Sequence, residues 1–214
     1  ALKKSLQQIA RSSQRAAHMV NQLLAMARAE NAAQSLTHPA INLARLATET
    51  VQDLVPRALE KRLDLGYEGP EAGRGGRGPL VSGQPVLLRE LIRNLVDNAL
   101  NYTPAGGTVT VRVVDDPFGQ VVVLQVEDSG PGIPAAEREK VFQPFYRALG
   151  TNVDGSGLGL AIVAEIAAQH GAEVALEDAN LRPRAGHASS PGARFTVRFP
   201  ATPAHVALPE PSKG

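Results

Sequence analysis

Between about residues 40 and 200, stretches of helical periodicity alternate with short runs of alternating apolar and polar residues, and this limits the possible folds more than any other feature. Amphipathic helices are predicted over residues 43–60, over residues 86–102, and over a stretch that opens at Gly155–Gly159 and stops at Gly171. Strands are predicted over residues 62–67, 108–114, 121–126, 173–177 and 194–199. Elements interleaved in this way predict one two-layer α/β domain.

The first 35 residues contain no proline or glycine and form a separate helical pattern. Apolar or small residues recur there at heptad spacing, namely Leu2, Leu6, Ile9, Ser13, Ala16, Val20, Leu23 and Ala27. Because this seam is thin, the long helix is expected to need partner helices from a second copy of the chain. The alternative is a helix packed on its own domain. Residues 36–200 would form that domain, and residues 201–214 a disordered tail.

The composition excludes several classes of function. Lys and Arg number 22 against 21 Asp and Glu, which gives no support for a nucleic-acid-binding surface. The absence of cysteine excludes disulfides, thiolate metal ligands and a cysteine nucleophile. No apolar run approaches about 18 residues and no signal peptide opens the chain, so this polypeptide is expected to be soluble. The glycine-rich residues 69–78 are expected to be a surface loop.

The helix predicted over residues 86–102 has an unusual polar face. Four polar residues lie there at helical spacing, Glu90, Asn94, Asn98 and Asn101. The buried side would consist of Leu88, Leu91, Leu95 and Ala99. Asparagine is unfavourable inside helices, so three on one face cost stability. Carboxamide oxygens suit a site that binds Mg²⁺ while phosphates supply the negative charge, although a plain polar surface explains this segment alone equally well.

A second segment, Val126 to Ile133, follows a predicted strand. The strand ends on a carboxylate, Asp128, beside Gly130 and Gly132. A buried acceptor there could bind an exocyclic amine such as that of adenine, and the glycines would let the backbone approach a flat base. Taken alone, an ordinary Asp-Ser-Gly turn is the better interpretation.

A third segment is the glycine-rich run from Gly155 to Leu160, which leads into a predicted helix. The free N–H groups and positive dipole end of a helix N-terminus would suit a phosphate. The run is not a Walker A loop, because no Lys-Ser/Thr pair follows it. It is not a dinucleotide fingerprint either, because its glycines are spaced G-x-G-x-G and no strand immediately precedes them. A flexible hinge is the alternative.

A fourth segment gathers aromatic residues in a chain that is only 4% aromatic. It runs from Val141 to Arg147 and contains Phe142, Phe145 and Tyr146. These side chains could anchor a mobile segment with Arg147 facing a phosphate. The alternative is a small hydrophobic staple.

The order and spacing of these segments resemble the ATP-binding domain of sensor histidine kinases. The N box corresponds to Asn94–Tyr102, the G1 box to Asp128–Gly132, the F box to Phe142–Phe145 and the G2 box to Gly155–Gly159. The resemblance covers about residues 40–200, and residues 1–35 resemble the second helix of the family's dimerisation and phosphotransfer hairpin. Similarity is greatest to the proteobacterial tricarboxylate and quorum-type sensors. The implied fold is α+β, a two-layer sandwich in which helices cover one face of a mixed sheet.

The resemblance assigns roles at the base and metal end of an ATP site. Asn98 would be the principal Mg²⁺ ligand, and Asn94 would contact a phosphate or the metal. Tyr102 would lie against adenine. Asp128 would accept a hydrogen bond from the adenine amine, in a pocket shaped by Gly130, Gly132 and Ile133.

At the phosphate end, residues 134–156 would be a mobile lid. The backbone of Gly155, Ser156, Gly157 and Gly159 would follow the phosphates, while Leu158 and Leu160 would hold this run against the core. Catalytic roles would fall to Asn94 and Arg147.

The family reaction moves the γ-phosphoryl group of Mg-ATP to a histidine, and then to an aspartate of a response regulator. By resemblance, the cofactors are ATP and Mg²⁺, and the partners are a receiver domain and a second copy of the chain. The polypeptide would be the cytoplasmic portion of a bacterial inner-membrane protein.

Two departures from the family pattern bear on activity. None of the five histidines is followed by an acid and, four residues on, a proline. The acceptor is therefore expected upstream of Ala1, so this polypeptide should bind ATP without phosphorylating itself. Asn101 stands where the family commonly has a basic residue, which suggests that one phosphate contact is absent.

Two rival functions remain open. One is another ATPase of the same superfamily, such as gyrase B, MutL or a serine-directed anti-sigma kinase. Gyrase-type enzymes place a water-activating glutamate four residues before the metal-binding asparagine, and here that position is Asn94. The other rival is a dimerising scaffold without nucleotide chemistry.

Overall fold

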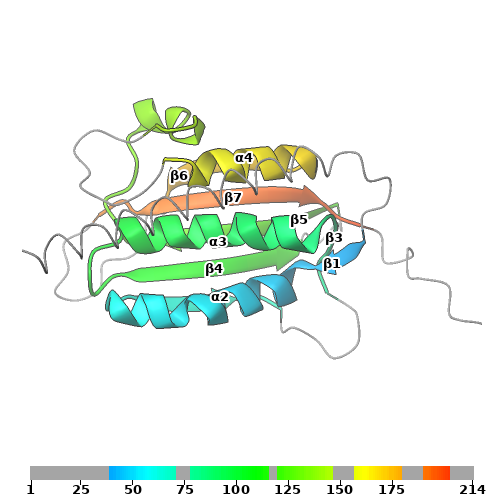
Figure 1. Ribbon diagram of the computed structural model, residues 1–214, viewed down its shortest axis with the longest axis horizontal. Helices are drawn as coiled ribbons and strands as arrows, with labels where there is room; N and C mark the ends of the chain where they lie inside the picture. Colours follow the sequence, from blue (N-terminus) through cyan, green and yellow to red (C-terminus); the bar gives the residue numbers. More distant parts are fainter. Residues whose placement is uncertain (1–38, 71–77, 116–119, 147–156, 180–189, 203–214) are drawn as a thin grey trace, which may run out of the picture.

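A computed structural model describes residues 39–70, 78–115, 120–146, 157–179 and 190–202 (Figure 1). The expected helix over residues 1–35 and the expected tail from residue 203 onward lie outside these ranges. Residues 147–156, which include Arg147, Gly155 and Ser156, lie outside them as well.

Five strands form the main sheet, in the order β2 (Asp64–Glu68), β4 (Thr108–Asp115), β5 (Val121–Asp128), β7 (Ala193–Pro200) and β6 (Glu173–Asp178). Only β2 and β4 run parallel, and the other neighbours pair antiparallel. The sheet is therefore mixed, as the family resemblance predicts. β5 is its middle strand, paired on both edges.

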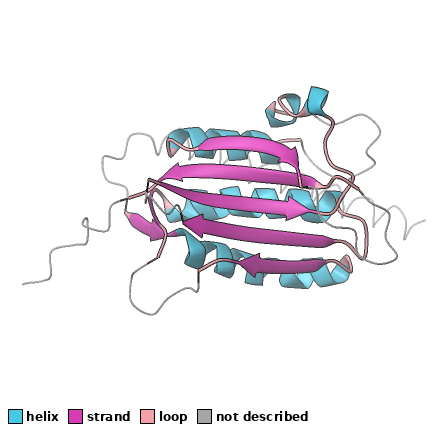
Figure 2. Cartoon of the chain, turned by 180° about the vertical axis from the view of Figure 1, so that it is seen from behind, coloured by secondary structure: helices cyan, strands magenta, loops and turns pink. Residues whose placement is uncertain are grey.

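Three helices lie side by side on one face of this sheet, while the other face carries none of the described helices (Figures 1 and 2). They are α2 (Leu43–Glu60), α3 (Pro85–Tyr102) and α4 (Gly159–Gln169). α3 lies between the other two and packs against both. Its start is favoured by Pro85 at the first turn, and α4 is followed by Gly171 at φ +61°, the left-handed terminator predicted from the sequence.

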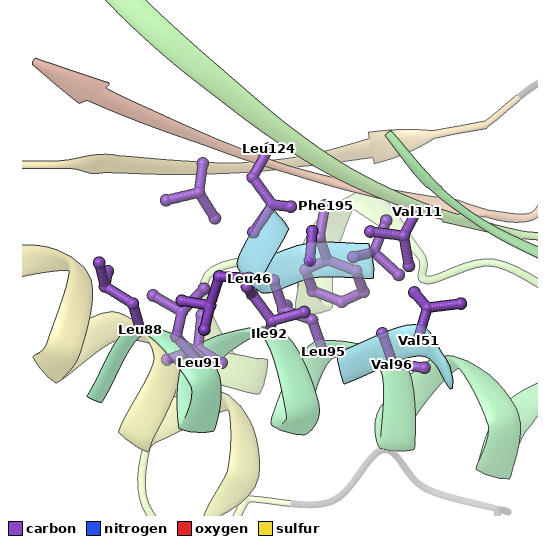
Figure 3. Packing of buried hydrophobic residues seen from close by; sticks show 14 of the residues in the cluster. Leu46, Val51, Leu88, Leu91, Ile92, Leu95, Val96, Val111, Leu124 and Phe195 are labelled. Atoms are coloured by element: carbon purple, nitrogen blue, oxygen red, sulfur yellow. The ribbon is translucent and has the colours of Figure 1, made fainter. Parts of the chain in front are cut away.

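The core lies between the helices and the sheet (Figure 3). Phe195 and Leu124 project from the sheet and are at most 1% exposed. The apolar side of α3 faces them, and Leu88, Leu91, Leu95 and Ala99 are all fully buried, as predicted. Because this helix contributes more of the largest fully buried side chains than either neighbouring helix, its orientation is tightly fixed.

Two short strands were not predicted. β1 (Ala40–Asn42) pairs antiparallel with β3 (Leu80–Ser82) beside the main sheet. Three residues are too few to show an alternating pattern, so sequence periodicity could not find them. In addition, β2 begins two residues later than predicted, because Arg62 adopts φ +58° in the turn after α2.

The helix-free face of the sheet carries a row of ion pairs, one residue from each strand. We call it the ion-pair row; in strand order it consists of Glu68, Arg112, Glu127, Arg194 and Glu177. At its centre, Glu127 Oε1 accepts from Arg112 at 2.9 Å and from Arg194 at 2.6 Å. Glu127 is only 2% exposed, so the row buries its central carboxylate between two guanidinium groups.

Candidate functional site

The asparagines on the polar face of α3 have different hydrogen-bond partners. Asn94 is 6% exposed, and its Nδ2 donates to the carbonyl oxygen of Glu90 at 2.9 Å and to Glu90 Oε1 at 3.1 Å. Asn98 is half-buried. Asn101 instead accepts hydrogen bonds from α2, as described below. Contacts within the helix therefore fix the Asn94 carboxamide, as needed for a group that positions a ligand.

Asp128 occupies the last position of β5. Side chains alternate between the two faces of a strand. Glu127 therefore lies in the ion-pair row on the helix-free face, and Asp128 points toward the helices. The Asp128 side chain is 3% exposed, and its Oδ1 accepts from the backbone N–H groups of Gly130 at 2.8 Å and Ala193 at 3.4 Å. Burial raises the pKa of Asp128 to about 6, and the two backbone hydrogen bonds oppose this rise.

The turn after Asp128, residues 129–133, is held by the segment that enters β7. The carbonyl oxygen of Gly130 accepts from Gly192 N at 3.1 Å and from Ser190 Oγ at 2.6 Å. Ser190, Gly192 and Ala193 were missed by the sequence reasoning. The pairing of β5 with β7, which sets Asp128 opposite Ala193, is the signal that could have found them.

The same turn meets the end of α3. A β-carbon at Gly130 would lie 3.0 Å from the carbonyl oxygen of Tyr102 and 2.8 Å from Asp128 Oδ1. Gly132, at φ +76°, leaves equally little room beside the Gly192 carbonyl. The structure thus brings the end of α3, at Tyr102, against the turn that follows Asp128, although the two segments are distant in sequence.

Gly192 should be intolerant of a side chain, and Gly171 provides a matched control. The two glycines have nearly equal φ angles, +62° and +61°. A β-carbon at Gly192 would collide with the carbonyl oxygen of Asp128, whereas one at Gly171 has no neighbour nearer than 3.8 Å. We expect Gly171→Ala to cost about 1 kcal/mol of unfolding free energy, and Gly192→Ala about 2–4 kcal/mol. Urea unfolding followed by circular dichroism measures both, and equal losses would contradict the close approach.

The aromatic segment and the glycine-rich run also meet. The backbone N–H of Phe145 donates to the carbonyl oxygen of Gly157 at 2.8 Å, and Gly157 has φ +72°. Leu158 is 2% exposed and Leu160 packs against the core. Gly159 opens α4. This arrangement presents the α4 N-terminus next to Phe145, which is 63% exposed.

Three further residues, Ile133, Phe142 and His170, make contacts that support the fold. Ile133 packs partly against the core, and its carbonyl oxygen accepts from Arg138 Nε at 3.0 Å. Phe142 meets Phe195 edge to face, with ring centroids 6.3 Å apart. His170 lies between two helix ends, with Nδ1 2.7 Å from the Ile166 carbonyl oxygen and Nε2 accepting from Gln84 N at 3.2 Å.

No cluster of three histidine or acidic side chains suited to a metal ion occurs in the part of the chain that the structure describes. Likewise, none of the described helices is long and apolar enough to cross a membrane.

A mixed sheet with helices on one face, a buried acid ending the middle strand and an asparagine-bearing helix beside it define an α+β domain of the ATPase type. Residues 83–203 match the family described as histidine kinase-, DNA gyrase B-, and HSP90-like ATPase. The chain belongs to this family.

Two curated relatives are named as sensor proteins. "Sensor protein kinase PmrB" of Pseudomonas aeruginosa is 37% identical over 175 residues, which cover 81% of this chain and 35% of that protein. "Sensor protein QseC" of Escherichia coli K12 is 34% identical over 174 residues, covering 81% of this chain and 36% of that protein. The chain therefore spans about a third of the length of the curated relatives it matches.

Solved structures are similar to this chain as well. "Mycobacterial sensor histidine kinase MprB" superposes with a TM-score of 0.64 at 27% identity, covering 78% of this chain and 99% of that one. Full-length ShkA in complex with AMPPNP gives a TM-score of 0.70 at 27% identity, covering 94% of this chain and 39% of that one. The family and the α+β fold expected from the sequence are confirmed.

Proposed function

We propose that this chain is the ATP-binding catalytic portion of a two-component sensor histidine kinase, with residues 36–200 as its nucleotide-binding domain. The observation that carries the proposal is the Asp128 carboxylate, which is buried on the helix side of the sheet. Its Oδ1 is held by two backbone N–H groups. Among the described residues these are its only hydrogen bonds, and both go to that one oxygen. The second carboxylate oxygen can therefore accept from the exocyclic amine of a purine.

The roles of the surrounding residues follow from where they lie. Tyr102 lies against the turn that contains Gly130 and Gly132, so it would flank the base that Asp128 recognises. Gly157 and Gly159, at the start of α4, would present backbone N–H groups to the phosphates. Arg147, Gly155 and Ser156 are proposed to complete the phosphate end of the site.

The residues present fit a magnesium ion that arrives with the nucleotide. The described part of the chain offers no carboxylate cluster for Mg²⁺, but Mg²⁺ is commonly held by a few protein oxygens together with substrate phosphates. Asn98 would supply such an oxygen, and Asn94, fixed by Glu90, would support it. When bound, the ion neutralises charge that develops on the phosphates.

In the proposed reaction, an imidazole nitrogen of an acceptor histidine forms a bond to the γ-phosphorus. The bond from that phosphorus to the β–γ bridging oxygen breaks, and ADP leaves with the electron pair. The domain contributes orientation and charge neutralisation, with no covalent bond to its own side chains. A response-regulator aspartate would then receive the phosphoryl group, and residues 1–35 would join two copies of the chain.

The structure favours transfer over hydrolysis by a gyrase-type mechanism. Such a mechanism needs a glutamate at position 94, whereas here an asparagine donates its amide hydrogens to Glu90. Without a carboxylate there, a water molecule has no general base at that position. The scaffold alternative does not explain why a buried carboxylate is kept at Asp128, where its desolvation costs stability.

Asn98→Ala tests the metal role. Removing the carboxamide oxygen should weaken ATP binding about 10- to 100-fold when Mg²⁺ is present, and by less than about threefold when the metal is chelated. Isothermal titration calorimetry with ATP, with and without Mg²⁺, measures both. Arg93→Ala, an exposed change on the same helix, is the control. Equal losses under both conditions would remove Asn98 from the metal site, and no ATP binding by the unaltered chain would defeat the proposed function.

A further inference from the structure

Two cations at the end of α2 converge on the N box, Arg57 in the last turn of the helix and Lys61 directly after it. Arg57 Nη2 donates to Asn101 Oδ1 at 3.1 Å, and Lys61 Nζ donates to the same oxygen at 2.6 Å. Lys61 also donates to the carbonyl oxygen of Leu100 at 3.1 Å. The end of α2 therefore brings positive charge to the last turn of α3, a helix with no basic residue of its own in that turn.

The two cations differ in how their charge is balanced. Arg57 forms an ion pair with Asp97, whose side chain is 13% exposed. Lys61 has no carboxylate partner among the described residues, and its two acceptors are a carboxamide and a backbone carbonyl. Desolvation, followed by repulsion from Arg57, lowers the pKa of Lys61, and attraction to the Asp97 carboxylate opposes this lowering. A half-buried ammonium group is thus held in place by neutral acceptors, with no ion pair of its own among the described residues.

Helix capping explains only part of this arrangement. A cation near the carbonyls at a helix C-terminus is stabilising, which accounts for the bond from Lys61 to Leu100. Capping does not require the second bond, to Asn101, which holds the ammonium group beside a residue of the polar α3 face that carries Asn98. Residues three apart on a helix have β-carbons about 5–6 Å apart, so Asn101 directly follows Asn98 on that face.

We propose that Lys61 is a phosphate-binding residue of the nucleotide site, held in position by Asn101. An ammonium group has three N–H donors, and its two hydrogen bonds leave one for an anion. The ligand chemistry is a polyphosphate whose base lies at Asp128, so the inference rests on the proposed function. Lys61, directly after α2, thereby supplies the positive charge that position 101 lacks.

The test compares a ligand that has phosphates with one that has only the base and sugar. Lys61→Met, Arg45→Met and the unaltered chain are titrated with ATP and with adenosine, using amide chemical shifts for the weaker ligand. Arg45→Met is the matched control, because it removes an exposed cation from the same helix. We expect Lys61→Met to weaken ATP binding about tenfold and to change adenosine binding by less than about twofold. Arg45→Met should change neither.

A second variant reverses the defect. In Lys61→Met/Asn101→Lys the ammonium group comes from α3, and ATP affinity should return to within about threefold of the unaltered chain. Unchanged ATP affinity in Lys61→Met, or equal losses for ATP and adenosine, would overturn the assignment and leave Lys61 as a helix cap. If the unaltered chain bound adenosine and ATP equally, the phosphate role would also fall, whereas no binding of either ligand would defeat the proposed function itself.

Discussion

Asp128→Asn is expected to abolish ATP binding while leaving the ligand-free domain at least as stable as before. The asparagine oxygen can still accept from Gly130 and Ala193, so the turn keeps its shape. Its amide nitrogen would then face the adenine amine, donor against donor. Loss of a charged hydrogen bond together with this mismatch should lower affinity at least about 100-fold, measurable by calorimetry.

The stability half of this prediction follows from the pKa of Asp128. The pKa is about 6 in the folded protein against 3.8 for the free side chain, so the folded state binds more protons than the unfolded state between these values. The contribution of this group to the free energy of unfolding is therefore greatest below about pH 4. It falls by roughly 3 kcal/mol as the pH rises through 6. Asp128→Asn removes this loss.

Urea unfolding at pH 5 and pH 7 tests whether the Asp128 carboxylate lowers stability as the pH rises. The stability of Asp128→Asn relative to the unaltered chain should be higher at pH 7 than at pH 5. Asp53→Asn, at a carboxylate that is 65% exposed, should show no such trend. A variant that lost stability more severely at pH 7 would show that the ionised carboxylate stabilises the fold, contrary to the burial argument.

Glu127→Ala should be the most destabilising single change in the ion-pair row. Its carboxylate is 2% exposed and accepts from both Arg112 and Arg194, so its removal leaves two partly buried guanidinium groups facing each other. Removing one partner from a buried ion pair costs about 3–5 kcal/mol, and we expect about 3 because both arginines retain some contact with water.

Glu177→Ala, at the end of the row, is the control for this change. Its side chain is 56% exposed and contacts Arg194 at 3.3 Å, so its loss should cost less than about 1 kcal/mol. Both values come from urea unfolding followed by circular dichroism. Similar small losses at the two positions would mean that the row contributes little to stability.

Sequence patterns predicted the long elements well because their periodicity extends over many residues. The helix over residues 43–60 has the predicted bounds, and α3, β4 and β5 differ from their predicted bounds by only one or two residues. β1 and β3 were missed because each is three residues long and is defined by its pairing with the other. Arg62 also shifted the start of β2, since nothing in its side chain signals a left-handed backbone.

The candidate site was less predictable where contacts cross between elements. Asp128, Gly130 and Gly157 could be singled out because a strand end and glycine spacing are local signals. Ser190 and Lys61 could not, since each reaches its partner from an element distant in sequence. The contact at Asn101 in particular sets Lys61, just after α2, beside the position where the sequence suggested that a phosphate contact is absent.

Because β5 is paired along both edges, the backbone that carries the acid at its end is held by both neighbouring strands. Base recognition would then be preorganised. A purine would lose its own rotational freedom on binding but would not have to order the group that selects it, so discrimination between adenine and guanine should persist even when the phosphates are removed.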